Sequence, residues 1–250
     1  MNPSKKSTNT KNEHSAFHPG ELLRECKQET SLILLLVPIV LTLWVYFGKQ
    51  ANATLLFPAL ETHWHLDFYS TMYEYVAAFI LMFCVPVFFI VVVFKKGLRN
   101  YGVRLGDARY GFRFLIAGIP VVLLVAFLGA GSPQMQAEYP LAKSAMGHPN
   151  LFLIIEIFYV IYYVSWEFLF RGFMLFGLEK RFGALMAILI QTIPSAIVHI
   201  GKPAGESFAA ILAGIVFGYL AIRTRSILYP LILHVLVGLG TDIFVTMRVF

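Results

Sequence analysis

The stretch LFLIIEIFYVIYYVSWEFLFRGFMLFGL, residues 151–178, decides the fold of this protein. It is long enough to cross a bilayer core, which takes about 20 helical residues. It nevertheless carries Glu156, Glu167 and Arg171 among Phe, Ile, Leu and Tyr side chains. Within lipid, only a helix or a closed barrel satisfies the backbone hydrogen bonds. We therefore expect this stretch to form a membrane helix that holds charged side chains inside the membrane.

The composition of the whole chain also indicates a membrane protein. Of its 250 residues, 58% are hydrophobic and 14% are charged, whereas soluble proteins have roughly 45–50% and about 25%. A soluble fold of this size cannot bury so much apolar surface, so we expect that surface to face a lipid bilayer. The net charge of +6 does not require a nucleic-acid partner, because basic residues in membrane proteins mostly mark cytoplasmic loops. We predict no binding to nucleic acid.

Apolar runs follow one another along the chain after a polar segment at 1–30. Six of these runs carry no Asp, Glu, Lys or Arg, and the seventh is the stretch quoted above. The runs are 31–48, 75–94, 114–131, 151–178, 182–200, 207–222 and 226–241. We predict an all-α fold, a polytopic membrane helix bundle of about seven transmembrane helices. It has two parts: a polar cytoplasmic N-terminal segment, 1–30, and a helical membrane domain, 31–250.

The basic residues between the runs predict the orientation of the chain. Fifteen of the 20 lie in the N-terminal segment and in the loops after the even-numbered runs, and four lie on the other side. Basic loops stay in the cytoplasm, so we expect a cytoplasmic N-terminus and an external C-terminus. We expect an integral, multi-pass protein of the bacterial inner (plasma) membrane.

Ionisable side chains at membrane depth are costly, and for this reason they indicate a functional site. Glu167 and Arg171 are four residues apart on one helical face, where they can pair; a purely structural ion pair is the alternative. Glu167 and His199 each lie 16 residues from Gly183, near which their two helices join. In an antiparallel hairpin these two residues therefore reach similar depth. His234 is the ionisable residue of the last run.

Two imidazoles and a carboxylate are a set that can activate water for amide hydrolysis. Glu167, His199 and His234 match the ligands of a catalytic zinc ion with an open coordination position. Without a metal, the same side chains could act as a general base and as donors to an oxyanion. The chain has no His-Glu-x-x-His motif. The pattern therefore leaves both alternatives open: a divalent metal such as zinc, or no cofactor.

Four motifs, taken in order, resemble those of the CPBP (ABI) family of intramembrane proteases, which includes the type II CAAX prenyl endopeptidases. Residues 166–172, Trp-Glu-Phe-Leu-Phe-Arg-Gly, are similar to the family signature Glu-Glu-x-x-Phe-Arg-Gly. Residues 101–107 resemble the upstream loop of the family, 195–199 its Phe-x-x-x-His motif, and 230–234 the start of its final His-x-x-x-Asn motif. The motifs with candidate chemistry lie in 166–242.

This resemblance implies an intramembrane endopeptidase whose substrate is a membrane-associated protein or peptide. It implies four catalytic residues: Glu167 activates water, Arg171 orients the glutamate, and His199 and His234 hold the water, a metal ion or the oxyanion. The chemistry would be hydrolysis of a peptide bond within the membrane.

Three positions depart from the family pattern. Trp166 stands where the family has its first glutamate, Ser195 where it has phenylalanine, and Gly238 where it has asparagine. Adjacent helical residues point about 100° apart, so Glu167 cannot take the place of the missing side chain. Either Glu167 serves as the base, or the protein is a catalytically inactive membrane adaptor or bacteriocin-immunity-type protein.

Two further carboxylates and one further class of function stay open. Asp242 and Glu156 are candidates to compensate for the missing glutamate; Glu156 lies eleven residues before Glu167, on nearly the same helical face. A transporter or channel is the third alternative, because charged side chains in membrane helices also line ion pathways. The two related halves with interrupted helices that are typical of transporters are not found in the sequence.

Overall fold

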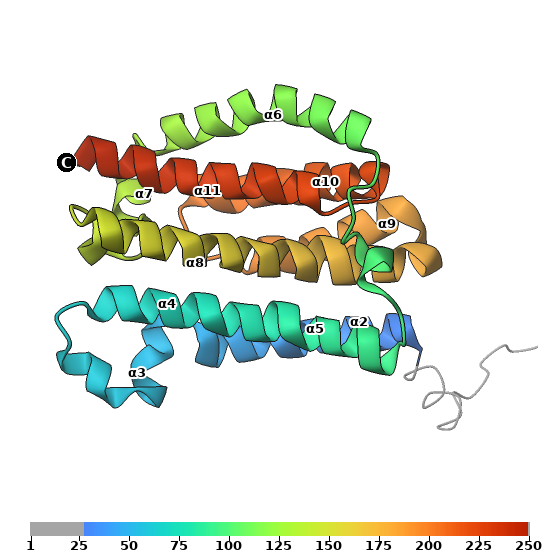
Figure 1. The fold of residues 1–250 in the computed structure, drawn as a ribbon, viewed down its shortest axis with the longest axis horizontal. Coiled ribbons are helices and arrows are strands. Elements are labelled where there is room, and N and C mark those ends of the chain that lie inside the picture. Colours follow the sequence, from blue (N-terminus) through green and yellow to red (C-terminus); the bar gives the residue numbers. More distant parts are fainter. Residues whose placement is uncertain (1–27, 250) are drawn as a thin grey trace, which may run out of the picture.

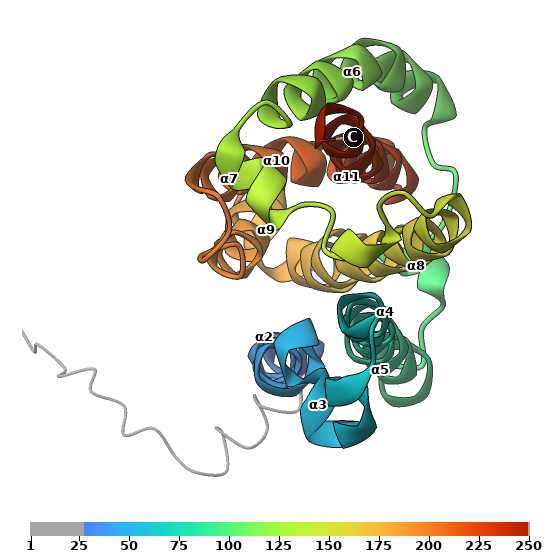
Figure 2. The same ribbon diagram turned by 90° about the vertical axis from the view of Figure 1, so that its left-hand side faces the viewer.

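The structure, a computed structural model, describes residues 28–249 and consists of helices and short connections (Figures 1 and 2). The described range contains no β-strand, so the prediction of an all-α fold is confirmed. Most of the predicted polar segment 1–30 lies outside the described residues.

The bundle is formed by long helices that run along a common direction (Figure 1). They are α2 (Glu29–Leu43), α4 (Leu66–Ala78), α6 (Ala108–Gly129), α8 (Pro149–Glu167), α9 (Leu175–Ile197), α10 (Ala204–Thr224) and α11 (Leu228–Val249). Short helices complete the chain: α3 (Ala53–Leu56), α5 (Val85–Phe88), α7 (Pro133–Glu138), η2 (Gln50–Asn52), η3 (Pro58–Thr62), η6 (Leu98–Tyr101) and η7 (Lys143–Ala145). Four π-helical segments extend the long helices: η1 (Trp44–Gly48), η4 (Phe79–Cys84), η5 (Phe89–Val93) and η8 (Phe168–Met174).

Six helical runs of the described chain are long and apolar enough to cross a membrane. One of them, Pro149–Ile197, has 49 residues. If straight it would be about 73 Å long, more than twice the roughly 30 Å bilayer core. At Gly183 the backbone leaves the helical region (φ 77°, ψ 164°), and the chain turns back so that α9 packs against α10 (Figure 1). The protein is a multi-pass helical bundle; the count of seven crossings and the cytoplasmic N-terminus stay predictions.

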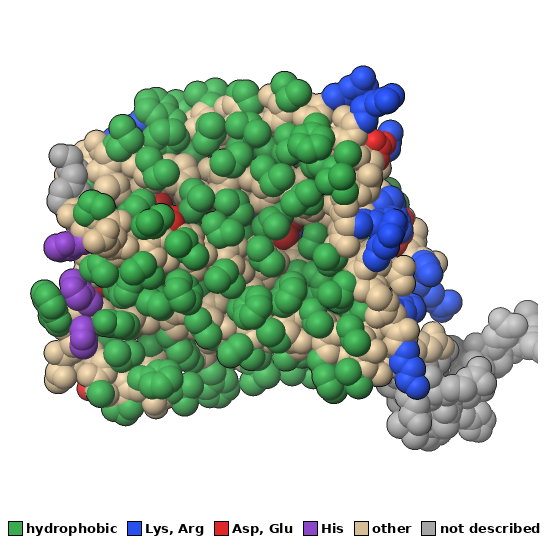
Figure 3. Space-filling view, viewed as in Figure 1, with side chains coloured by type: hydrophobic (Ala, Val, Ile, Leu, Met, Phe, Trp, Pro, Cys, Tyr) green, Lys and Arg blue, Asp and Glu red, His purple; other side chains and the backbone are tan. Residues whose placement is uncertain are grey.

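The surface divides into an apolar belt and two different ends. Hydrophobic side chains cover the visible face of the bundle, while Lys and Arg gather at one end and His at the other (Figure 3). Two connections at the basic end meet directly, because Asp107 N donates to Thr224 O at 2.8 Å. The loops that the sequence assigns to one side of the membrane therefore include neighbours at one end of the molecule.

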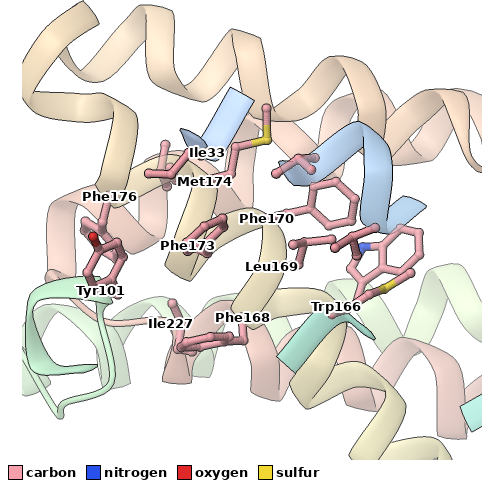
Figure 4. Close-up of a cluster of buried hydrophobic side chains, with 14 of the residues drawn as sticks. Ile33, Tyr101, Trp166, Phe168, Leu169, Phe170, Phe173, Met174, Phe176 and Ile227 are labelled. Atoms are coloured by element: carbon pink, nitrogen blue, oxygen red, sulfur yellow. The ribbon is translucent and has the colours of Figure 1, made fainter. Parts of the chain in front are cut away.

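The largest buried cluster surrounds η8 (Figure 4). Phe168, Phe170 and Phe173 are fully buried there, and Ile33 of α2 packs against the same region. Gly177 permits this approach, because a Cβ at that position would lie 2.2 Å from the Ile33 side chain. The segment with the signature residues thus lies at the centre of the protein, away from lipid.

Candidate active site

Glu167 ends α8 directly before η8 and is fully buried. Its Oε1 lies 3.2 Å from Nη1 of Arg171, one turn further along, and Arg171 is also buried. An unpaired charge in such surroundings would cost several kcal/mol, and the ion pair offsets this cost. The predicted Glu167–Arg171 pair is thus present, in the centre of the bundle.

His234 of α11 is bound to the same carboxylate. Its Nδ1 lies 2.7 Å from Oε1 of Glu167, and its ring lies beside those of Tyr163 and Phe217, at centroid distances of 4.5 and 5.7 Å. Because a carboxylate accepts this bond, Nδ1 carries the proton, which leaves Nε2 as the second functional nitrogen. Glu167 therefore sets both the tautomer and the orientation of His234.

His199 lies in the connection between α9 and α10, and backbone groups hold it there. Its Nδ1 lies 2.7 Å from the carbonyl oxygen of Ser195, which can only accept, so Nδ1 is again the protonated nitrogen. The Ser207 hydroxyl donates to the carbonyl oxygen of His199 at 2.7 Å. Because Ser195 acts here through its main chain, this contact does not depend on the side chain at the position where the family has phenylalanine.

The two histidines line one cavity with a volume of about 60 Å³. Within residues 28–249, Glu167 and Arg171 do not line it. The cavity lining consists of aromatic, basic and acidic side chains and two aliphatic ones: Trp44, Lys49, Glu74, Tyr75, Tyr139, Leu141, Tyr159, Tyr162, Tyr163, Trp166, Val198, His199, Lys202, Glu206 and His234. The structure thus places His199 and His234 at the cavity and the Glu167–Arg171 pair behind His234.

Aromatic rings lie at two of the positions where the chain departs from the family pattern: Trp166 is itself aromatic, and the Tyr163 ring lies beside Gly238. Trp166 lines the cavity, and its ring meets that of His199 at a centroid distance of 5.3 Å. A Cβ on Gly238 would lie 2.0 Å from the Tyr163 hydroxyl oxygen, so the tyrosine side chain fills the space above this glycine. That hydroxyl donates to Tyr159 at 2.7 Å. Trp166 and Tyr163 therefore form walls of the cavity.

The side chains at this site do not fit a metal ion in the arrangement observed. No group of three or more His, Cys, Asp or Glu residues in the described part of the chain is placed to hold one. Oε1 of Glu167 is already shared by Arg171 and His234, and the adjacent guanidinium would repel a cation. Metal ligation by Glu167, His199 and His234 stays a prediction.

Two carboxylates that were candidates to compensate for the missing glutamate lie elsewhere. Glu156 of α8 and Asp242 of α11 are both buried, yet neither lines the cavity as the structure describes it. The carboxylates that do line it are Glu74 and Glu206. The sequence pattern did not identify Glu206 as a cavity residue, because Glu206 lies one residue before the apolar run that begins at 207. Its position in the first turn of the helix after His199 was the feature that could have indicated it.

The residues that resemble the upstream family loop, 101–107, form what we call the clamp loop. Hydrogen bonds join it to the turn between α10 and α11: Ile227 N donates to Gly102 O at 3.0 Å, and the side-chain Nε of Arg104 donates to the main-chain oxygen of Arg225 at 2.8 Å. The Tyr229 hydroxyl donates to Leu105 O at 2.7 Å. This loop fixes the start of α11, which carries His234, and it supplies no group to the cavity lining.

One comparison with known proteins covers the part of the chain that carries these site residues. Residues 148–239 match the family model Type II CAAX prenyl endopeptidase Rce1-like. The match confirms the predicted resemblance, and the Rce1-like region contains Glu167, Arg171, His199 and His234. It supports a CAAX-type, protease-like function of a multi-pass integral membrane protein, with a membrane-associated protein as the class of substrate. No curated protein and no solved structure matches the chain.

Proposed function

We propose that this protein is an intramembrane endopeptidase that hydrolyses a peptide bond of a membrane-associated protein or peptide. One observation carries the proposal: imidazoles of His199 and His234 line the same cavity inside a membrane helix bundle, with a buried carboxylate bound behind His234. The Rce1-like match supports the same class of reaction.

In this mechanism Glu167 acts through His234. A water molecule in the cavity donates one proton to Nε2 of His234 while its oxygen attacks the carbonyl carbon of the peptide bond. The carboxylate of Glu167 stabilises the imidazolium that forms, as the acid of a catalytic triad does. His199 Nε2 accepts a hydrogen bond from the same water and holds it in place. Arg171 pairs with Glu167 and orients its carboxylate.

The test is cleavage of candidate membrane peptides by the purified protein in liposomes. Glu167→Gln, His199→Ala and His234→Ala should each lower kcat/KM by roughly 100-fold or more, as expected for loss of a general base or its support. Glu61→Gln is the matched control, because Glu61 is exposed and does not line the cavity. Equal cleavage by all of these proteins would rule out the assigned site.

The second candidate is a catalytically inactive membrane adaptor or immunity-type protein of the same fold. Trp166 favours it, since this ring forms a cavity wall where the family has its first glutamate. An adaptor needs the shape of the cavity but not its acid–base chemistry. Under this alternative, Glu167→Gln keeps full biological activity, and wild-type protein cleaves no peptide of a diverse membrane-peptide library.

We also place the protein in a bacterial plasma membrane with its basic end in the cytoplasm. The gathering of Lys and Arg at one end supports this orientation (Figure 3). Single cysteines introduced at Lys96 and at Glu61 would test it with a membrane-impermeant thiol reagent on intact cells. Labelling at Glu61 and protection at Lys96 are expected, and the reverse pattern would contradict the orientation.

A further inference from the structure

The mechanism above uses neither carboxylate that lines the cavity. Glu74 is held by Gln50 N at 2.9 Å and by Lys49 at 3.7 Å, which leaves Glu206. It lies in the first turn of α10 and lines the same cavity as His199 and His234. The next residue, Ser207, is bound to the main chain of His199 at 2.7 Å. Through this bond the first turn of α10, which carries Glu206, is tied to the backbone of His199.

Both oxygens of Glu206 have defined surroundings. Oε1 accepts a hydrogen bond from the Tyr139 hydroxyl at 2.7 Å, and Tyr139 is itself buried. Oε2 is buried and has no hydrogen-bond partner among residues 28–249. Lys202, the cation nearest in sequence, pairs with Glu138 at 2.6 Å. A charged oxygen left buried and unpaired is costly, so these surroundings favour a proton on Oε2.

We propose that Glu206 is the general acid of this site, which protonates the leaving amine. The inference rests on the proposed peptidase function and deepens it. It also restores a second carboxylate to a site where Trp166 replaces the first glutamate of the family. The two carboxylates then have separate tasks: Glu167 supports the base, His234, and Glu206, which lines the cavity, supplies the acidic proton.

The proton transfers balance over one turnover. Water gives one proton to His234 as its oxygen bonds to the carbonyl carbon. Glu206 Oε2 then gives its proton to the amide nitrogen as the carbon–nitrogen bond breaks, which yields a carboxylic acid and an amine. The new acid returns its proton to Glu206, and His234 passes its proton to the amine. One water is consumed, and both side chains regain their starting states.

The experiment compares two leaving groups in the same peptide, an amide and an activated aryl ester. An amine must be protonated to leave, whereas an aryl oxide leaves without a proton. Glu206→Gln should therefore lower amide hydrolysis by roughly 100-fold or more and leave aryl-ester hydrolysis unchanged. Glu167→Gln and His234→Ala should lower both. Equal losses on amide and ester by Glu206→Gln would overturn the proposed role.

Two further variants separate this role from a structural one. Glu206→Asp keeps the acid and should recover part of the amide activity, while Tyr139→Phe removes only the hydrogen bond to Oε1 and should lower amide hydrolysis less than Glu206→Gln. Unfolding temperatures in detergent show whether each variant is folded. A folded Glu206→Asp protein as inactive on the amide as a folded Glu206→Gln protein would contradict the general-acid role.

A labelling experiment gives an answer even if the wild type cleaves neither substrate, in which case the peptidase proposal itself fails. Dicyclohexylcarbodiimide modifies protonated carboxyl groups in membrane proteins. Mass spectrometry should find the label on Glu206 and not on Glu167, which is bound to Arg171 and His234. Label on Glu167 with Glu206 unmodified would show that Glu206 is not the protonated carboxyl group of the cavity.

Discussion

The clamp loop and the active-site cluster both lie on motifs that resemble one family, yet they use their residues differently. In the clamp loop, the contacts of Gly102, Arg104 and Leu105 go to or come from main-chain atoms. In the cluster, the contacts of Glu167 join side chains that can exchange protons. Similarity to a family motif therefore has two different meanings here. The clamp loop holds the start of α11 in place, whereas the residues around Glu167 and His234 can take part in chemistry.

Each region also has its own Arg–Glu pair. Arg225 of the turn that the clamp loop contacts lies 2.6 Å from Glu179, and Arg171 lies 3.2 Å from Glu167. The shorter pair is the partly exposed one, with 43% of the Arg225 side chain accessible, whereas Arg171 is 1% exposed. Distance alone does not rank the two pairs, because water screens the exposed pair and not the buried one.

The largest expected effect comes from breaking the buried pair. Arg171→Ala leaves the Glu167 charge without its partner in the centre of the bundle and should destabilise the protein by about 3–5 kcal/mol. Arg225→Ala should cost about 0–1 kcal/mol. Unfolding in mixed micelles measures both. The double variant Arg171→Ala/Glu167→Gln should recover part of the loss, and equal destabilisation by the two single variants would remove the contrast.

Gly106→Ala tests the clamp loop itself. Gly106 has a φ of +61°, and a Cβ there would lie 1.9 Å from the carbonyl oxygen of Thr224. Strain and overlap with main chain together should cost about 2–4 kcal/mol. Gly97→Ala is the matched control, since its Cβ would meet nothing within 4 Å. A Gly106→Ala protein as stable as the Gly97→Ala protein would show that the loop does not hold the turn.

Gly238→Ala tests the packing of Tyr163, a residue of the cavity wall, against Gly238. Its methyl group would displace the Tyr163 ring from beside His234, with an expected cost of about 1–3 kcal/mol and a loss of cleavage. Tyr163→Leu in the same chain should restore stability, because it removes the overlapping atoms. Gly129→Ala, whose Cβ would meet nothing within 4 Å, is the control. Unchanged stability of the single variant would mean that Tyr163 does not occupy this space.

The smallest effect concerns Asp107, at the end of the clamp loop. A hydrogen bond from Tyr110 N, and then one from Arg223, lower the pKa of this carboxyl. A lowered folded pKa contributes stability above the unfolded value of about 4, and this contribution is lost as the pH falls through the folded pKa. The wild type should unfold at a slightly higher temperature than Asp107→Asn at pH 7. The difference should shrink as the pH falls below about 4.

Local features of this fold could be predicted from sequence, because they depend on helical geometry. The membrane helices follow from apolar runs, and the Glu167–Arg171 pair follows from a four-residue spacing on one helix. The order of motifs also identified both imidazoles that line the cavity.

Contacts between distant segments were not predictable in the same way. Tyr139 and Glu206 are 67 residues apart, and their hydrogen bond depends on how the connection after α7 folds over the cavity. The position of Glu167 behind His234, instead of at the cavity, depends on which way each side chain points at the junction of α8 with the π-helical segment η8. Neither periodicity nor spacing carries that information.

The cavity volume sets a condition on the substrate. With a volume of about 60 Å³, the cavity has room for a few water molecules, each of which needs roughly 10–15 Å³, and not for an α-helix about 10 Å across. Under the proposed peptidase function, a transmembrane helix therefore presents its peptide bond here only where it is unwound. Cleavage then requires local unwinding of the substrate helix. The protein should therefore cleave segments with helix-breaking residues near the scissile bond faster than equally apolar segments that are rich in leucine and alanine.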